Sequence, residues 1–505
     1  MHATTDLASA DASPRDTKGT IPLLLLAAFV VILNETILAM ALPHLMDDLR
    51  IDAVTAQWLS TAFMLTMAVV IPITGYVMQR FNTRPVFLVA MGLFSAGTLL
   101  AAVSVGFPML LMARIVQASG TAIMLPLLMT TILNLIPMAQ RGKMMGNITI
   151  VMSLAPAMGP TVSGVILQWL SWRWIFILVL PIAIGVLVIG YLRLKNVTDP
   201  QVMRIDVGSV VLSAFGFGGL VYALSKIGEG SPSGTATLVV SLVVGLAALT
   251  AFVVRQLKLQ RSGFPLLDLR TFGSRTFSLS IGVLMVSFAA LIGSAILLPI
   301  YLQNVRGLTT ITAGMLLLPG GLIMGLMGPF VGRLFDRYGP RVLTIPGSLL
   351  VVAALFGFSR IGAETSLPML LGLHIAMMVG LSLTFTPVFT SGLNALPRRL
   401  YPHGSALVGT LQQVAGAAGT ALLVTVMAMA AGRAATEGAT ETLALQTGVQ
   451  TALGVAALMA IGGVVLVAFI GRPPASDSSE PDESGASGDG FAQPEPEPEV
   501  AGQLR

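Results

Sequence analysis

One stretch of the sequence occurs twice, as TAQWLSTAFMLTMAVVIPITGYVMQRFNTR (55–84) and again as TAGMLLLPGGLIMGLMGPFVGRLFDRYGPR (312–341). Each copy passes from an apolar run into a short basic segment. Identical residues fall at matching positions, among them Thr55/Thr312, Pro72/Pro329, Gly75/Gly332, Arg80/Arg337 and Arg84/Arg341. A repeat of this length predicts that the chain is built from two related halves.

The composition around the repeat is that of a membrane protein. Of 505 residues, 55% are hydrophobic and 10% are charged, against about 25% charged in soluble domains. There is no cysteine and there are 4 scattered His, so neither a disulfide nor a metal site is expected. We expect no cofactor. The pI near 9.7 does not indicate nucleic-acid binding, because basic loops on one side of a membrane explain it equally well.

Crossing a bilayer as a helix takes about 20 apolar residues. Fourteen stretches meet this length, and we expect a helix at each: 21–43, 58–78, 85–105, 108–133, 144–170, 174–192, 205–225, 235–254, 277–303, 313–332, 342–359, 367–392, 404–428 and 450–470. Residues 1–20 are polar and the first apolar run is of spanning length, so no cleavable signal peptide is expected. The predicted fold class is an all-α membrane protein.

The basic residues orient these spans. If both termini are cytoplasmic, 21 of the 28 Lys and Arg fall in inner segments, 6 fall in outer loops, and Arg114 lies within a span. Such an excess of inner basic residues supports both the helix count and the orientation. We expect a multi-pass protein of the cytoplasmic membrane, surrounded by lipid.

The repeat divides the spans into a 6 + 2 + 6 order. We expect a cytoplasmic tail (1–20), an N-terminal six-helix bundle (21–192), two inserted linker helices (205–254), a C-terminal six-helix bundle (277–470) and an acidic, disordered cytoplasmic tail (471–505). Two related halves are typical of transporters that hold a substrate between them near the middle of the membrane.

Several motifs resemble those of one transporter family. GRLFDRYGPR (332–341) is similar to the loop between helices 2 and 3 of major facilitator superfamily proteins, and RIVQASGTAIMLP (114–126) to their helix-4 motif. LAPAMGPTVSGVI (154–166) resembles the helix-5 motif of drug antiporters, and LNETILAMALP (33–43) the helix-1 motif of the fourteen-helix branch. The chain is identified as a member of the drug:proton antiporter-2 family, most similar to its lincomycin-resistance-type exporters.

The resemblance implies a major facilitator fold and, by its motifs, a set of residues that control conformational change. These are Gly75, Arg80, Arg84, Gly159, Pro160, Gly164, Gly332, Asp336, Arg337 and Arg341. Gly159 and Pro160 should form a bendable contact with a facing helix of the C-terminal half. The N-terminal loop departs from the family motif. Gln79 stands where the motif has Asp, and Asn82 stands where it has Gly. Any interaction at this loop that holds the transporter in one conformation must therefore come from Arg80 and Arg84, bonding to helix ends.

Glu35 is the one carboxylate well inside a predicted span. An ionisable group at that depth is costly and usually functional, so it is the candidate proton-coupling residue. Arg114 lies at a similar depth and is its candidate partner. The family's usual Asp is replaced by Asn34. The alternative role for Glu35 is a structural hydrogen bond to a neighbouring helix, and for Arg114 a bond to loosened backbone near helix 1.

The substrate cavity should be mostly apolar, lined by Met, Phe and small residues. Polar residues inside spans are its candidate contacts: Asn34, Thr36, Asn147, His374, Gln412 and Gln413. The function these features predict is proton-driven export of amphiphilic small molecules such as antibiotics, by a bacterial protein working as a monomer. The alternatives are export of a dedicated metabolite or lipid, and a transport-inactive sensor or assembly partner. The sequence shows no ATP-binding motif and no recognisable catalytic arrangement, so we do not expect an enzyme.

Overall fold

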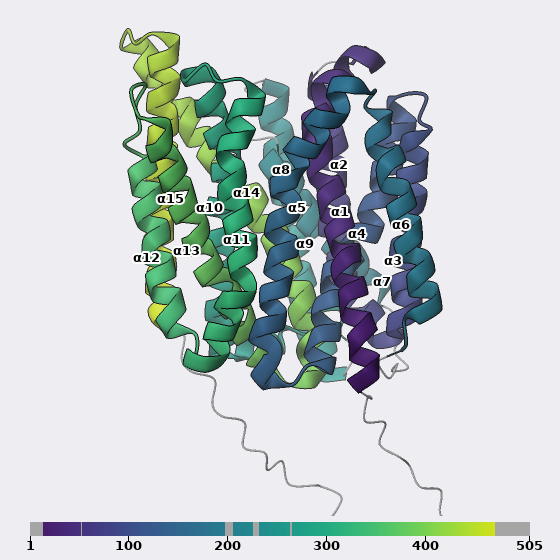
Figure 1. Ribbon diagram of the computed structural model, residues 1–505. Helices are drawn as coiled ribbons and strands as arrows, with labels where there is room; N and C mark the ends of the chain where they lie inside the picture. The colour runs from purple at the N-terminus through teal and green to yellow at the C-terminus, as the bar shows by residue number, and fades with distance from the viewer. Residues whose placement is uncertain (1–13, 52, 197–205, 226–231, 263–264, 470–505) are drawn as a thin grey trace, which may run out of the picture. The chain divides into compact units, whose positions relative to one another are not determined.

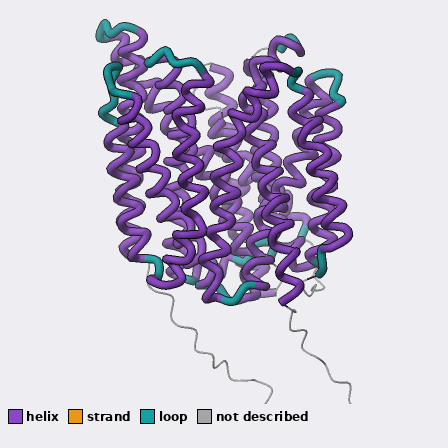
Figure 2. Tube along the Cα trace, viewed as in Figure 1, coloured by secondary structure: helices purple, strands orange, loops and turns teal. Residues whose placement is uncertain are grey.

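The computed structural model describes residues 14–51, 53–196, 206–225, 232–262 and 265–469, all within one compact unit, Met1–Arg472. The regular elements in these ranges are all helices, most of them running side by side (Figures 1 and 2). The first helix begins at Pro14, inside the segment predicted as a tail. The predicted tail at 471–505 lies outside the described residues.

Two groups of six long helices account for most of the described chain. The N-terminal set comprises α1 (Pro14–Leu49), α2 (Ala53–Arg80), α3 (Thr83–Ala102), α4 (Phe107–Leu135), α5 (Arg141–Trp169) and α6 (Arg173–Arg193). The C-terminal set comprises α10 (Arg275–Ile300), α11 (Thr310–Tyr338), α12 (Arg341–Phe358), α13 (Leu367–Asn394), α14 (Tyr401–Thr436) and α15 (Glu441–Ala468). Short helical turns η1 (Met138–Gln140), η3 (Leu269–Gly273), η4 (Tyr301–Val305) and η5 (Arg398–Leu400) adjoin them.

Within the described residues, 13 helices are long and apolar enough to cross a membrane. This confirms the all-α membrane fold. The fifth predicted span is not among the 13, yet it forms α5, a helix of 29 residues that packs between α1 and α11 (Figure 1). The count of fourteen and the cytoplasmic placement of the termini stay predictions.

Local signals in the sequence set several helix ends. The hydroxyls of Ser274, Thr309 and Thr440 each accept a hydrogen bond from a backbone N–H in the first turn of α10, α11 and α15. These bonds satisfy donors that a helix start leaves free. Gly339 ends α11 with a φ of 80°, a conformation that suits glycine. Asn82, its counterpart in the N-terminal loop, has a φ of −64° and makes no such turn.

The two sets meet most extensively along two pairs of helices. α5 packs against α11, and α2, the counterpart of α11 in the repeat, packs against α14. The α5–α11 contact is very close, because a Cβ built on Gly146 would lie 2.2 Å from the carbonyl oxygen of Gly328. Small residues allow such approach between helices in a membrane.

The two inserted helices pack beside the α2–α14 contact. The first is α7 (Val207–Ser213), a π-helical turn η2 (Ala214–Gly218) and α8 (Gly219–Ser225), and it touches both α2 and α14. The rings of Trp58 on α2 and Tyr222 on α8 lie 5.7 Å apart. The second, α9 (Pro232–Ser262), packs on the first and leaves much of its surface exposed. The insertion therefore covers the junction of the two sets on one side.

An ion pair joins the two inserted helices at one end. Asp206 caps α7 by accepting from the backbone N–H of Ser209, and Arg255 of α9 donates to both its carboxylate oxygens at 2.7 Å. The hydrogen bond from Arg255 is the main reason that the pKa of Asp206 lies well below its usual range. The carboxylate thus stays charged throughout the physiological range.

Replacing this cap should loosen the inserted helices. We expect Asp206→Ala to cost about 1 kcal/mol through loss of the cap, measured as a lower unfolding temperature of the purified protein. Asp206→Asn keeps a capping oxygen and loses the ion pair, so it separates the two contributions. Because the folded-state pKa is depressed, the ion-pair contribution is present at neutral pH and lost as the pH falls through that pKa. An unchanged unfolding temperature in both variants would contradict the anchoring role.

Candidate functional site

The structure distinguishes Glu35 from its neighbour Asn34. Glu35 lies in the middle of α1 and is half-buried, whereas Asn34 is 0% exposed and neither atom of its amide has a hydrogen-bond partner. Asp336 and Glu441, by contrast, lie near the ends of their helices. Of these two side chains, only Glu35 has an ionisable group, and it is partly exposed.

Arg114 is held within the N-terminal set. It is 2% exposed, its Nη1 donates to Gln117 Oε1 at 2.6 Å, and Gln117 Nε2 donates to Thr98 on α3 at 2.8 Å. Its guanidinium lies over the ring of Phe63 on α2, 4.0 Å from the centroid, a cation–π contact. The Nε of Arg114 has no partner. Side chains from three helices therefore fix the orientation of this cation.

Glu35 and Arg114 are near one another without touching. Each charge acts electrostatically on the other, but in the described part of the chain they form no ion pair within 4.0 Å. The Nε of Arg114, which has no hydrogen-bond partner, is the donor that such a pair would use. The predicted pairing is thus possible by position and absent in this conformation.

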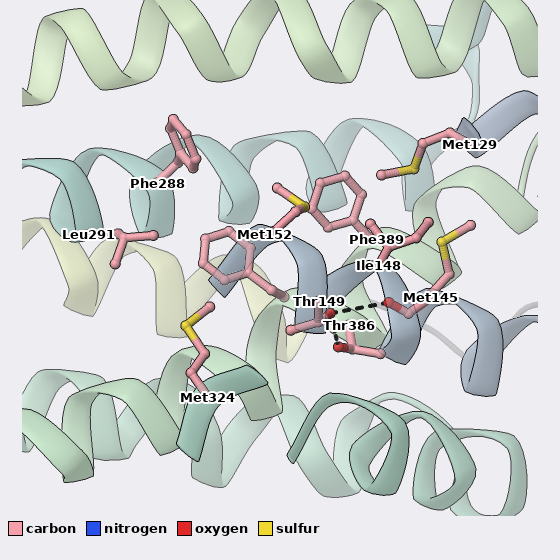
Figure 3. Close-up of a pocket in the computed structure, with 11 residues that line it drawn as sticks. Met129, Met145, Ile148, Thr149, Met152, Phe288, Leu291, Met324, Thr386 and Phe389 are labelled. Atoms are coloured by element: carbon pink, nitrogen blue, oxygen red, sulfur yellow. Dashed lines mark hydrogen bonds between the residues drawn. The ribbon is translucent and has the colours of Figure 1, made fainter. Parts of the chain in front are cut away.

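An apolar pocket lies between the two helix sets (Figure 3). Its cavity volume in this conformation is small, about 40 Å³, and the pocket opens on one side. Its lining comes from α4, α5, α10, α11 and α13: Met129, Met145, Ile148, Thr149, Met152, Phe288, Leu291, Met324, Phe385, Thr386 and Phe389. The abundance of Met and Phe matches the composition that the sequence predicts for the cavity. Flexible Met side chains suit ligands of varied shape.

The polar residues predicted to line the cavity lie elsewhere. None of Asn34, Thr36, Asn147, His374, Gln412 and Gln413 belongs to the lining of this pocket. His374 donates from Nε2 to the carbonyl of Leu317, which ties α13 to α11, and the amide of Asn147 points to the sulfur of Met144. Gln412 is buried, and its amide nitrogen has no partner. These six residues do not line this pocket, and their role as substrate contacts stays a prediction.

Both loops of the repeat bond to the opposite helix set. Asp336 accepts from the backbone N–H groups of Gly142 and Lys143 at 3.0 and 3.1 Å, at the start of α5. A carboxylate is favourable at a helix start. At the matching position, Gln79 is hydrogen-bonded to His403 Nε2 at 2.8 Å, near the start of α14. The side chain that replaces the usual Asp therefore still joins the sets.

Three basic residues of these loops, Arg80, Arg84 and Arg337, make local contacts. Arg84 donates to the carbonyl of Tyr191, in the last turn of α6 within its own set, as expected of a residue that bonds to a helix end. Arg80 lies over the ring of Phe81 and Arg337 over the ring of Tyr338. Among the loop contacts described, those that cross between the sets come from Gln79 and Asp336, whereas Arg84 bonds to a helix end within its own set.

Arg141 is a further cross-set residue, which the sequence does not distinguish from the other basic loop residues. It is 4% exposed, and its Nη1 donates to Asn394 Oδ1 and to Tyr401 Oη, both at 2.9 Å. Its Nε and Nη2 donate to carbonyls at the end of α4. These bonds close the sets together at the end of the bundle where α5 starts. Only burial, which the sequence does not reveal, could have identified it.

The glycines of α5 have different neighbours from those predicted. A Cβ on Gly159 would lie 2.3 Å from Thr36 Oγ1 on α1, within the same set, and nothing lies within 4 Å of one on Gly164. The close contacts with the C-terminal set are at Gly146 and at Gly142, where an added Cβ would lie 2.6 Å from the carbonyl oxygen of Gly332. The predicted contact of Gly159 with a C-terminal helix was therefore wrong, and α5 continues without interruption through Pro160.

Sequence comparison places these features in a family. The major facilitator superfamily model matches residues 24–420, which is most of the chain. The chain belongs to the major facilitator superfamily. It is 42% identical to the uncharacterized transporter YcnB of Bacillus subtilis over 473 residues, 94% of this chain and 99% of that protein. It is 45% identical to the lincomycin resistance protein LmrB of Listeria monocytogenes over 403 residues, 80% of this chain and 85% of the relative.

Solved structures of the superfamily share the fold. The human organic anion transporter MFSD10 superposes with a TM-score of 0.63 at 15% identity, covering 89% of this chain and 99% of that one. As a major facilitator superfamily protein with relatives in bacteria, the chain is a multi-pass transporter of the bacterial cell membrane, and not an enzyme. The resemblance to lincomycin-resistance-type members that its motifs predict is confirmed.

Proposed function

We propose that this transporter exports amphiphilic drugs in exchange for protons, by alternating access between the two helix sets. The observation that carries the proposal is the half-buried Glu35, set beside the charge of Arg114 within a helix set that shares an apolar pocket with the other set. An exchanger needs a group that takes up a proton on one side of the membrane and releases it on the other. It also needs a substrate site that both halves build.

The contacts at one end of the bundle support the alternating-access part of the proposal. Arg141, Asp336 and Gln79 each join the N-terminal set to the C-terminal set there. Such hydrogen bonds can break and reform as a unit when the sets rock. In this reading, residues 21–192 and 277–470 move as two bodies around the pocket.

Lincomycin is the first compound to test, because relatives of 41–45% identity are named lincomycin resistance proteins. Purified protein is reconstituted in liposomes with an acidic lumen that contains a pH-sensitive dye. We expect added lincomycin to speed the loss of protons from the lumen, since drug enters as protons leave. Protein-free liposomes give the background rate. No acceleration by lincomycin or by other amphiphilic antibiotics would refute proton-coupled drug export.

A further inference from the structure

Two hydroxyls are the polar side-chain groups of the pocket lining. Thr149 on α5 and Thr386 on α13 are hydrogen-bonded to each other with 2.7 Å between their oxygens, and the bond crosses from one helix set to the other (Figure 3). They are 6% and 1% exposed. The other lining residues are Met, Phe, Ile and Leu. Whatever polar selectivity the pocket has must come from this pair.

Either hydroxyl can donate in this bond, and the neighbouring bond of Thr149 favours one direction. Thr149 Oγ1 lies 3.2 Å from the backbone carbonyl of Met145, to which it can donate. A hydroxyl has one proton, so the arrangement in which Thr149 keeps this bond has Thr386 as the donor between the two hydroxyls. In that arrangement the Thr386 hydroxyl can donate to a ligand, provided that an acceptor on the ligand takes the place of Thr149.

The lining also restricts the charge of a ligand. None of the side chains that line the pocket is ionisable. A charged ligand would lose its hydration there without gaining an opposite charge, which is costly. An uncharged ligand with large apolar surface loses little and gains contacts with Met and Phe side chains.

We propose that this pocket binds uncharged, largely apolar molecules bearing a hydrogen-bond acceptor, and that the acceptor takes the hydroxyl proton of Thr386 in place of Thr149. This assignment rests on the proposed drug export and names one chemical class that the pocket takes; a compound with a protonatable amine, such as lincomycin, would enter it only in its uncharged form. Binding then breaks a hydrogen bond between the two helix sets, so the substrate itself loosens their junction at the pocket.

Three dyes separate the parts of the proposal. Nile red is neutral and has one ring carbonyl, diphenylhexatriene is apolar and has no acceptor, and ethidium is a permanent cation. Each is titrated against the full-length protein in lipid nanodiscs, with empty nanodiscs as the blank and without a proton gradient. We expect Nile red to bind more tightly than ethidium. Binding without a gradient is independent of proton coupling, so failure here is distinguishable from failure of proton-coupled export.

The threonine variants are predicted to act in opposite directions. Thr386→Val keeps the side-chain shape and removes the donor, so Nile red should bind about three- to tenfold more weakly. Thr386→Ser keeps the donor and should bind like the wild type. Thr149→Val removes the competing acceptor, so Nile red should bind more tightly. The affinity for diphenylhexatriene should not change when either hydroxyl is removed.

Other outcomes overturn the assignment. Equal weakening of Nile red and diphenylhexatriene by Thr386→Val would mean that the residue contributes shape alone. Weaker Nile red binding in both valine variants would mean that the pair acts as one structural unit. Tighter binding of ethidium than of Nile red would refute the neutral class. Unfolding temperatures without dye show whether each variant is folded. If Thr386→Val does not fold, Thr149→Val still tests the proposal through the direction in which the affinity for Nile red changes.

Discussion

Glu35→Gln should abolish drug-dependent proton flux in proteoliposomes, reducing it to the rate of protein-free liposomes. Glutamine has the size of glutamate and can hydrogen-bond, but it does not bind or release a proton. The described carboxylates at helix ends are not placed to substitute for one in the middle of α1. Because the pocket takes no lining residue from α1, the variant should bind Nile red as the wild type does. Loss of flux with binding retained would assign Glu35 to coupling.

Two variants serve as controls for this result. Glu35→Asp keeps a carboxylate and should keep part of the flux. The double variant Asn34→Asp/Glu35→Gln moves the carboxylate to the position usual in the family, where the side chain is 0% exposed. It should not restore flux, because about 100° of rotation around the helix separates the two positions. Wild-type flux in Glu35→Gln would show that protons pass elsewhere.

Gly146→Ala should prevent the close contact of α5 with α11. The added Cβ would lie 2.2 Å from the carbonyl oxygen of Gly328 and 2.6 Å from Cα of Pro329. Both are backbone atoms, so no rotamer change relieves the overlap and the helices must separate. Overpacking of this kind costs about 1–3 kcal/mol. The population of this arrangement should then fall roughly 5- to 150-fold.

Drug-dependent proton flux measures the effect, because a cycle that cannot close this end of the bundle does not turn over. Gly164→Ala is the matched control on the same helix, since nothing lies within 4 Å of its added Cβ. It should leave the flux unchanged. Equal loss in both variants would indicate a general effect of alanine in α5, and full activity in Gly146→Ala would show that this contact is dispensable.

The helices themselves were largely predictable from the sequence. Long apolar runs decide where a chain crosses a bilayer, and the repeat assigned α2 and α11 to equivalent places. The bounds differ at the ends, as at α1, which begins at Pro14 because a helix can continue past the apolar run into polar solvent. Hydropathy reports the apolar core of a span and not its full length.

The neighbours of each helix face were not predictable in the same way. In water, an apolar stripe marks the buried face, but a membrane helix is apolar on both its lipid-facing and its buried side. The sequence therefore gave no means to tell that Gly159 faces α1 while Gly146 faces α11. The polar lining of the pocket was not predictable for a related reason. Amide and His side chains inside spans are distinctive in a sequence, whereas Thr149 and Thr386 resemble the many threonines that bond to their own helix.

The pocket and the carboxylate stand on different helices. Its lining comes from α4, α5, α10, α11 and α13, whereas Glu35 belongs to α1. A substitution in the lining therefore leaves the carboxylate itself in place, although α4 and α5 of the lining also pack against α1. If Glu35 couples proton flow as proposed, selection by a new toxic compound can act on Met and Phe side chains of the lining without replacing the coupling group. Transporters of this build should diversify their range of compounds quickly and their driving ion slowly.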